Sequence, residues 1–243
     1  MKQKAPLKLT LEGLDPNLTV NQRVYRSLRN ALMCGAIAPG RALTIRELAG
    51  LLDVSPMPVR EALRQLAAEN ALEILGNRRV QVPRMSAMKF RELYEARIAL
   101  ESHAAERALP YIDQARIDEL RRIDAEIDAA YFEGDHDRVS ICNQRFHRCL
   151  YEANPHQVTV PLIESLWLQL GPFMRLATSQ LDEHYQVDRH NEALDAIRSQ
   201  DAFALRRAIA ADIRDGNAFV VDSGLLDEVM DDSPKVGARS AGD

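Results

Sequence analysis

The sequence has no long hydrophobic run and few cysteines. No apolar stretch approaches the roughly 20 residues needed to span a bilayer, and the N-terminal MKQKAPLKLT lacks the apolar core of a secretory signal peptide. We therefore expect a cytoplasmic protein without a membrane partner. The cysteines, Cys34, Cys142 and Cys149, form no CxxC pair, which argues against a zinc finger and favours reduced thiols in structural roles.

The sequence also lacks the short motifs of common catalytic sites. It contains no HExxH, no glycine-rich phosphate loop and no nucleophile–histidine pair of recognisable spacing. A strand pattern is missing throughout the C-terminal two thirds. These absences argue against an enzyme and favour a mainly helical protein.

Charge is distributed unevenly along the chain. The whole protein has a net charge of −5, but residues 1–85 carry 13 Lys and Arg against 7 Asp and Glu, a net charge of +6. The remainder carries 18 against 29, a net charge of −11. A basic segment joined to an acidic one is typical of a protein with one polyanion-binding part and one part of different function.

The basic segment begins with a polar stretch, residues 1–17, which we interpret as a flexible arm. An apolar stripe with helical spacing then predicts a helix over about 17–36, which the APG at 38–40 ends. Thr44 is a candidate N-cap for a second helix, because Glu47 three residues later completes the capping-box pattern.

A third helix is marked by its prolines. Ser55 is a candidate N-cap, Pro56 falls at the first helical position and Pro58 still lies in the first turn, where proline is tolerated. The helix is followed by the apolar pieces LEIL and VQV, which flank a basic tip at 76–79 and predict a β-hairpin. Residues 18–84 thus predict a winged helix-turn-helix domain of three helices and a hairpin.

In a winged helix-turn-helix, the second helix of the motif presents its N-terminal residues to the major groove of DNA. Arg60 and Arg64 lie on one face of that helix, Arg46 lies near the start of the preceding helix, and a basic wing tip suits the minor groove. The alternative is a solvated helix face without a partner. The predicted DNA-contacting residues are Arg46, Ser55, Met57, Arg60, Arg64, Asn77, Arg78 and Arg79.

The stretch APGRALTIRELAGLLDVSPMPVREALRQLAAENALEI, residues 38–74, resembles the N-terminal domain of GntR-family bacterial transcription regulators. The resemblance implies DNA contacts by Arg46, Arg60 and the wing tip. Many members have Arg where this chain has Pro56, so the operator sequence does not carry over.

The acidic part predicts an all-α bundle over residues 85–225, followed by a disordered tail at 226–243. Asp113, Asp135 and Asp201 stand at predicted N-caps. The Gly171–Pro172 pair should kink or split one helix. The predicted helices are 87–109, 114–133, 136–153, 156–179, 186–199 and 202–221.

Three pieces of this bundle, YEARIALESHAAERA, NQRFHRCLYEANP and RHNEALDAI, resemble the FCD effector domain of FadR-like GntR regulators. The resemblance implies a domain that binds an effector and forms a homodimer. Whether its helices follow the six-helix or the seven-helix version of the domain stays open.

The bundle contains candidate metal ligands. Asn143 and His147 are four residues apart, so both lie on one helix face, and facing helices could bring His190 and Asp212 to the same place. The alternative is that His147 is an ordinary core or surface histidine. Many FCD domains hold a divalent metal with Asp or Asn, a His four residues later and two further His. Asp212 stands where the last of these His residues is expected. The identity of the metal, Zn²⁺, Ni²⁺ or Mn²⁺, stays open.

Arg97 is, by the same resemblance, the candidate clamp for an effector carboxylate; the alternative is an ion pair with Glu101 on its own helix. We interpret Glu95 and Glu101 as structural. Trp167, Phe173 and Met174 could line the pocket or belong to the core.

Together these features predict a ligand-responsive, homodimeric regulator of transcription. We expect it to bind a palindromic operator in double-stranded DNA and to be a repressor released by a small organic acid. The alternatives are a metal-dependent enzyme that uses Asn143, His147, His190 and Asp212, and a non-specific architectural DNA-binding protein.

Overall fold

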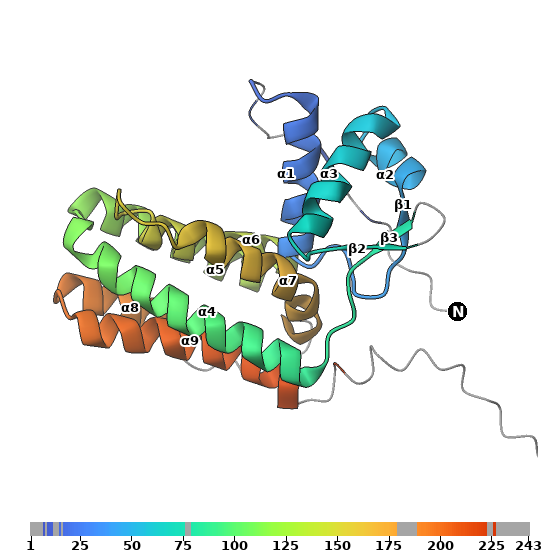
Figure 1. The fold of residues 1–243 in the computed structure, drawn as a ribbon. Helices are drawn as coiled ribbons and strands as arrows, with labels where there is room; N and C mark the ends of the chain where they lie inside the picture. The colour runs from blue at the N-terminus through green and yellow to red at the C-terminus, as the bar shows by residue number, and fades with distance from the viewer. Residues whose placement is uncertain are drawn as a thin grey trace, which may run out of the picture.

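The computed structural model describes residues 7, 9–11, 15, 17–75, 79–178, 189–222 and 226. Figure 1 shows two parts, a small N-terminal one that contains α1 to α3 and a sheet, and a longer helical bundle formed by α4 to α9. Within the described ranges, no helix has the length and apolar character needed to cross a membrane. The predicted fold class, a winged helix-turn-helix followed by an all-α bundle, is confirmed.

The first three helices are α1 (Val20–Met33), α2 (Ile45–Leu51) and α3 (Pro56–Ala68). Thr44 caps α2 as predicted, because its hydroxyl accepts a hydrogen bond from the backbone N–H of Glu47 at 3.1 Å. Ser55 stands at the N-cap of α3 but its side chain makes no capping hydrogen bond. The start of α3 is therefore fixed by Pro56 at its first position.

The sheet has the order β1-β3-β2 and is antiparallel. The strands β2 (Glu73–Leu75) and β3 (Arg79–Gln81) confirm the predicted hairpin, while the tip with Asn77 and Arg78 lies outside the described residues. The strand β1 (Leu43–Thr44) was not predicted. A two-residue strand has no sequence period, and only its pairing with Val80 and Arg79 defines it.

The bundle contains all six predicted helices, with a short 3₁₀ turn at Leu109–Tyr111 after the first. The side chains of Asp113, Asp135 and Asp201 each accept a hydrogen bond from a backbone N–H three residues later, as predicted for N-caps. The helices are α4 (Ala87–Ala108), α5 (Gln114–Phe132), α6 (His136–Tyr151), α7 (Val160–Thr178), α8 (Arg189–Arg198) and α9 (Ala202–Asp222).

Of the predicted kink or split at Gly171–Pro172, the split is wrong, because α7 runs through both residues. Gly171 has a packing role instead. A Cβ atom there would lie 2.4 Å from the carbonyl oxygen of Met33 and 2.6 Å from that of Leu32, so only glycine lets α7 approach the end of α1 this closely.

The two parts share a continuous apolar core, and α1 is the element that joins them. Gly35, just after α1, has a φ of +71° and would place a Cβ 2.6 Å from Cβ of Arg175 in α7. Arg29 of α1 reaches Glu164 of α7 at 2.7 Å. The N-terminal part is therefore packed against the bundle through α1 and α7 (Figure 1).

Candidate functional site

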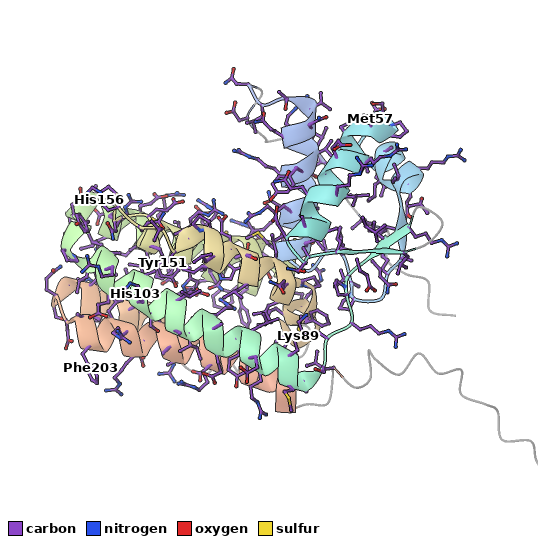
Figure 2. The ribbon with its side chains drawn as sticks, in the orientation of Figure 1. Met57, Lys89, His103, Tyr151, His156 and Phe203 are labelled. Atoms are coloured by element: carbon purple, nitrogen blue, oxygen red, sulfur yellow. The ribbon has the colours of Figure 1, made fainter. Side chains whose placement is uncertain are left out.

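Basic side chains on α2, α3 and β3 form an exposed face of the N-terminal part. The buried positions of α3 are Pro58, Val59, Ala62, Leu63 and Leu66, which leaves Arg60 and Arg64 on the opposite, exposed side. Met57, 59% exposed, lies at the outer end of α3 and points away from the bundle (Figure 2). The helix therefore presents its N-terminal residues to solvent.

These predicted DNA-contacting residues differ in their partners. Arg46, Arg60 and Arg79 are exposed and have no ion pair within the described ranges, whereas Arg64 pairs with Glu61 at 3.1 Å. Ser55 is also exposed. Unpaired exposed guanidinium groups are suited to phosphate or base contacts.

In the bundle, three of the four predicted metal ligands meet. One ligand atom from each of His147, His190 and Asp212 lies within 4.8 Å of the others. Nε2 of His147 is 3.1 Å from one carboxylate oxygen of Asp212, and Nε2 of His190 is 3.8 Å from the other. Asn143 lies one turn before His147 in α6, where it lines the adjoining cavity.

The other nitrogen of each histidine has an oxygen partner. Nδ1 of His190 is 2.8 Å from Oδ1 of Asp124, and Nδ1 of His147 is 3.0 Å from the hydroxyl of Tyr151. A carboxylate can only accept, so Nδ1 of His190 donates; the Tyr151 hydroxyl donates to Glu101 at 3.0 Å and so accepts from His147.

Both Nε2 atoms therefore face the Asp212 carboxylate in the tautomer that a metal requires, held by outer partners typical of metal-binding histidines. The donor set, two imidazoles and a carboxylate, fits a borderline divalent cation.

Asp212 stays ionised in this environment. Burial alone would raise the pKa of its carboxyl. When no metal is bound and both imidazoles also carry a proton on Nε2, the hydrogen bond from His147 and the charges of His190 and Arg97 outweigh burial and lower the pKa to about 2. A permanent negative charge at this point favours a cation between the histidines.

Glu101 is the centre of a buried network. It is fully buried, and its carboxylate accepts hydrogen bonds from Nε of Arg97 at 2.7 Å, Nε1 of Trp167 at 2.9 Å and the Tyr151 hydroxyl. The buried contacts of Glu101 agree with the structural role that we predicted for it. The predicted ion pair between Arg97 and Glu101 is also formed. Because the pair engages Nε, the rest of the guanidinium can still serve the cavity that Arg97 lines.

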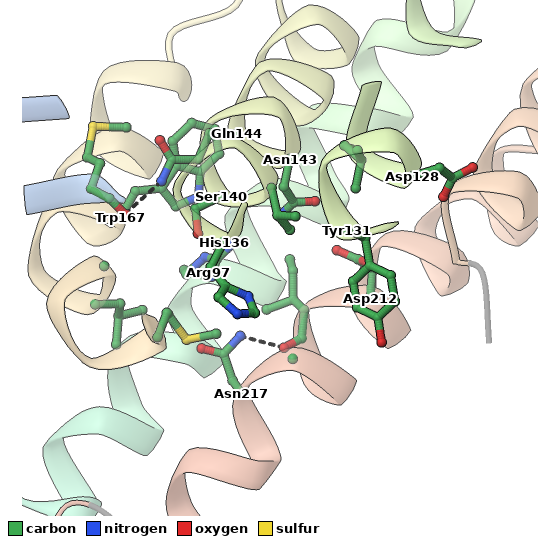
Figure 3. Close-up of a pocket in the computed structure, with 18 residues that line it drawn as sticks. Arg97, Asp128, Tyr131, His136, Ser140, Asn143, Gln144, Trp167, Asp212 and Asn217 are labelled. Atoms are coloured by element: carbon green, nitrogen blue, oxygen red, sulfur yellow. Dashed lines mark hydrogen bonds between the residues drawn. The ribbon is translucent and has the colours of Figure 1, made fainter. Parts of the chain in front are cut away.

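A cavity of about 210 Å³ adjoins the histidine cluster between α4, α5, α6, α7 and α9. Figure 3 shows Arg97, Asn143, Trp167 and Asp212 around it. Trp167 and Met174 line the cavity, whereas Phe173 does not and packs edge-on against Phe90 at a centroid distance of 6.4 Å. The polar residues that line the cavity are Arg97, Asp128, Tyr131, His136, Ser140, Asn143, Gln144, Asp212 and Asn217.

One wall of the cavity belongs to the N-terminal part. Met33, the last residue of α1, lines it, and Nε2 of Gln144 donates a hydrogen bond to the Met33 carbonyl at 2.9 Å. Gly171, which contacts the same carbonyl, also lines the cavity. An occupant would therefore touch the joint between the two parts.

Sequence reasoning did not find Asp124, Tyr151, Met33, Gln144 or Asn217. Tyr151 could have been found, because it continues the Asn143–His147 stripe by one more turn. The other four are brought to the site by packing between helices, which leaves no local pattern.

Comparison with known proteins assigns this architecture. Residues 20–82 match the family of bacterial regulatory proteins called the gntR family, and residues 92–215 match the FCD domain. The chain belongs to the GntR family and carries an FCD domain. It is thus a DNA-binding transcription regulator with an effector-binding domain, and the family is one of regulators, not of enzymes.

This GntR regulator is similar to McbR of Escherichia coli K12, with 26% identity covering 82% of this chain and 91% of that protein. It is also 26% identical to the gluconate operon transcriptional repressor of Bacillus subtilis strain 168, over 86% of this chain and 88% of that protein. The solved structure of E. coli McbR superposes with a TM-score of 0.79 at 25% identity, covering 85% of this chain and 99% of that one.

Proposed function

We propose that this regulator is a homodimeric repressor whose two α3 helices bind the half-sites of a palindromic operator, and that a small carboxylate bound in the bundle releases it. The observation that carries the proposal is the cavity, which combines a buried Arg97 with a wall from α1. Residues 18–84 would bind DNA, and residues 85–225 would bind the effector and form the dimer. A regulator of chromosomal DNA acts in the cytoplasm.

The DNA-binding residues of the proposal are those on the exposed basic face. Arg60 would reach a base edge, and the exposed Arg64, Ser55 and Met57 of the α3 region and Arg46 of α2 would make further contacts with the DNA. Arg79, at the start of β3, would contact the backbone or minor groove with the adjoining Asn77 and Arg78.

His147, His190 and Asp212, with Asn143 beside them, would hold the divalent cation, which is Zn²⁺, Ni²⁺ or Mn²⁺. Such a cation would supply a coordination position for one carboxylate oxygen of the effector. Arg97 would bind the other, and Trp167 and Met174 would cover its carbon chain.

The signal would pass through α1. An effector that displaces Gln144 or Met33 changes the contact between α1 and α7, and with it the placement of α3 relative to the partner's α3. A tenfold loss of DNA affinity requires only about 1.4 kcal/mol of difference between the two arrangements.

The first test is sequencing of genomic fragments retained by the purified protein at near-physiological salt, with Arg60→Ala in parallel. We expect the wild type to enrich a few short palindromes, and we expect Arg60→Ala to lose about 1–3 kcal/mol of specific binding. Arg198→Ala is the control, because Arg198 is exposed on α8, far along the chain from the basic face.

Uniform retention that disappears with modest added salt would favour the architectural alternative. If Arg60→Ala lowers the melting temperature as well as the DNA affinity, the loss of DNA binding would be explained by loss of folding. The enzyme alternative has no supporting observation in this family.

A further inference from the structure

Asn217 of α9 has a polar atom that the protein leaves without a partner. The side chain is 1% exposed and lines the cavity beside Gly216. Its amide nitrogen donates a hydrogen bond to the carbonyl of Ile213 at 2.6 Å, while Oδ1 has no hydrogen-bond partner among the described residues (Figure 3).

The orientation of this amide is set by its neighbour. The Ile213 carbonyl can only accept, so the NH₂ group must face it and Oδ1 must face elsewhere. A buried carbonyl oxygen without a donor is costly, and nearly all such atoms in proteins are paired. Because no described residue supplies a donor, an occupant of the cavity can supply it.

The surroundings select an uncharged donor. Across from this stretch of α9 lies the apolar Met174, whose methyl group is 3.9 Å from the position of a Cβ on Gly216. A buried ammonium group at Oδ1 would also require a carboxylate partner, and the two carboxylates of the cavity lie elsewhere in it, Asp128 on α5 and Asp212 beside the histidines. A hydroxyl needs only one acceptor. A neutral amide therefore matches a hydroxyl.

We propose that Asn217 is a specificity residue that accepts a hydrogen bond from a hydroxyl of the effector, so that the ligand is a hydroxy-carboxylate. This inference rests on the proposed binding of a carboxylate near Arg97 and Asp212. Asn217 follows Asp212 by five residues, which corresponds to a rise of about 7.5 Å along α9. The hydroxyl is thus separated from the carboxylate by several carbons.

The test uses hexanoate and four derivatives, 2-hydroxyhexanoate, 5-hydroxyhexanoate, 6-hydroxyhexanoate and 6-aminohexanoate, titrated into the full-length protein by calorimetry. We expect 5- or 6-hydroxyhexanoate to bind the wild type about tenfold more tightly than hexanoate. In Asn217→Leu we expect this preference to disappear, so that hexanoate and its 5- and 6-hydroxy derivatives bind with about equal affinity. Met174→Leu is the matched control and keeps the preference, since it alters the wall without removing the acceptor.

Asn217→Asp is a second variant, which keeps an acceptor oxygen and adds a charge. We expect this variant still to bind 5- or 6-hydroxyhexanoate and to bind 6-aminohexanoate more tightly than the wild type does. An unchanged hydroxyl preference in Asn217→Leu, or tightest wild-type binding by the amine, would overturn the inference. Equal binding of hexanoate and all hydroxy acids would overturn it and leave the carboxylate effector standing. Binding of no acid at all would contradict the proposed function itself.

Discussion

At the scale of single residues, the effector domain is organised by two carboxylates with different surroundings. Glu101 accepts hydrogen bonds from Arg97, Trp167 and Tyr151 and thereby orients these three side chains. Asp212 faces two imidazoles and stays charged, with a pKa lowered to about 2. The first carboxylate fixes the cavity wall, and the second has the charge and geometry of a metal ligand.

A prediction about metal content follows from the histidine cluster. His147→Ala and His190→Ala should each lose bound Zn²⁺, Ni²⁺ or Mn²⁺, because each removes a ligand that faces Asp212. Asp124→Asn should weaken binding by about 10–100-fold, since it removes the partner that orients His190. The measurement is elemental analysis by mass spectrometry after incubation with each metal and desalting.

His103→Ala is the control for that experiment, because His103 is exposed on α4 (Figure 2). We expect it to bind as much metal as the wild type, and all variants should keep basal DNA binding. Unchanged metal content in His147→Ala would remove His147 from the ligands.

At the scale of elements, the contact between α1 and α7 decides how the two parts meet. Gly35 and Gly171 let the backbones approach, and the ion pair of Arg29 with Glu164 lies beside this contact. Arg148 of α6 also pairs with Glu164, so three helices converge there. Pro172 lies within α7, where it removes one hydrogen bond of the helix, and α7 packs against α1, α4 and α9.

Gly171→Ala should destabilise the protein by about 1–3 kcal/mol, because its Cβ would overlap the Met33 and Leu32 carbonyls. The matched control is Gly50→Ala in α2, where a Cβ would meet nothing within 4 Å. That change should be neutral or stabilising by up to about 1 kcal/mol, as for alanine in an exposed helix. Urea unfolding measures both. If the two variants are equally stable, the close backbone contact between α1 and α7 at Gly171 is not formed in solution.

At the scale of the whole molecule, the cavity and the domain joint share residues. Met33, Gln144 and Gly171 belong to both, so a ligand bound at the proposed site would contact the DNA-binding part directly. The effect of effector on DNA affinity must equal the effect of DNA on effector affinity, whatever the path.

Gln144→Glu should weaken this coupling. Glutamate has nearly the same shape but cannot donate to the Met33 carbonyl, so the link between cavity and α1 is lost. We expect the affinity for operator alone to change little, while the tightest-binding acid of the hexanoate series shifts operator affinity clearly less than in the wild type. Fluorescence anisotropy with labelled operator, with and without the acid, measures the shift.

Gln169→Glu is the control for the coupling experiment, because the Gln169 amide donates to Ser165 within α7 and not across the joint. It should respond to the acid as the wild type does. An identical response in Gln144→Glu would exclude this hydrogen bond from the signal path.

The sequence by itself determined the elements and most of their ends. Caps at Thr44, Asp113, Asp135 and Asp201, and the proline at the start of α3, act through neighbours in the chain, so local patterns reveal them. The i,i+4 spacing of Asn143 and His147 likewise placed both on one face before any fold was known.

Only the tertiary structure decided which side chains face each other. Asp124 meets His190 across 66 residues, Gln144 meets Met33 across 111, and Arg97 was shown to pair with Glu101 while also lining the cavity. The same holds for Gly171, which reads as a helix breaker but is a point of close helix contact. Such contacts depend on the packing of whole helices, and no periodicity within a segment encodes them.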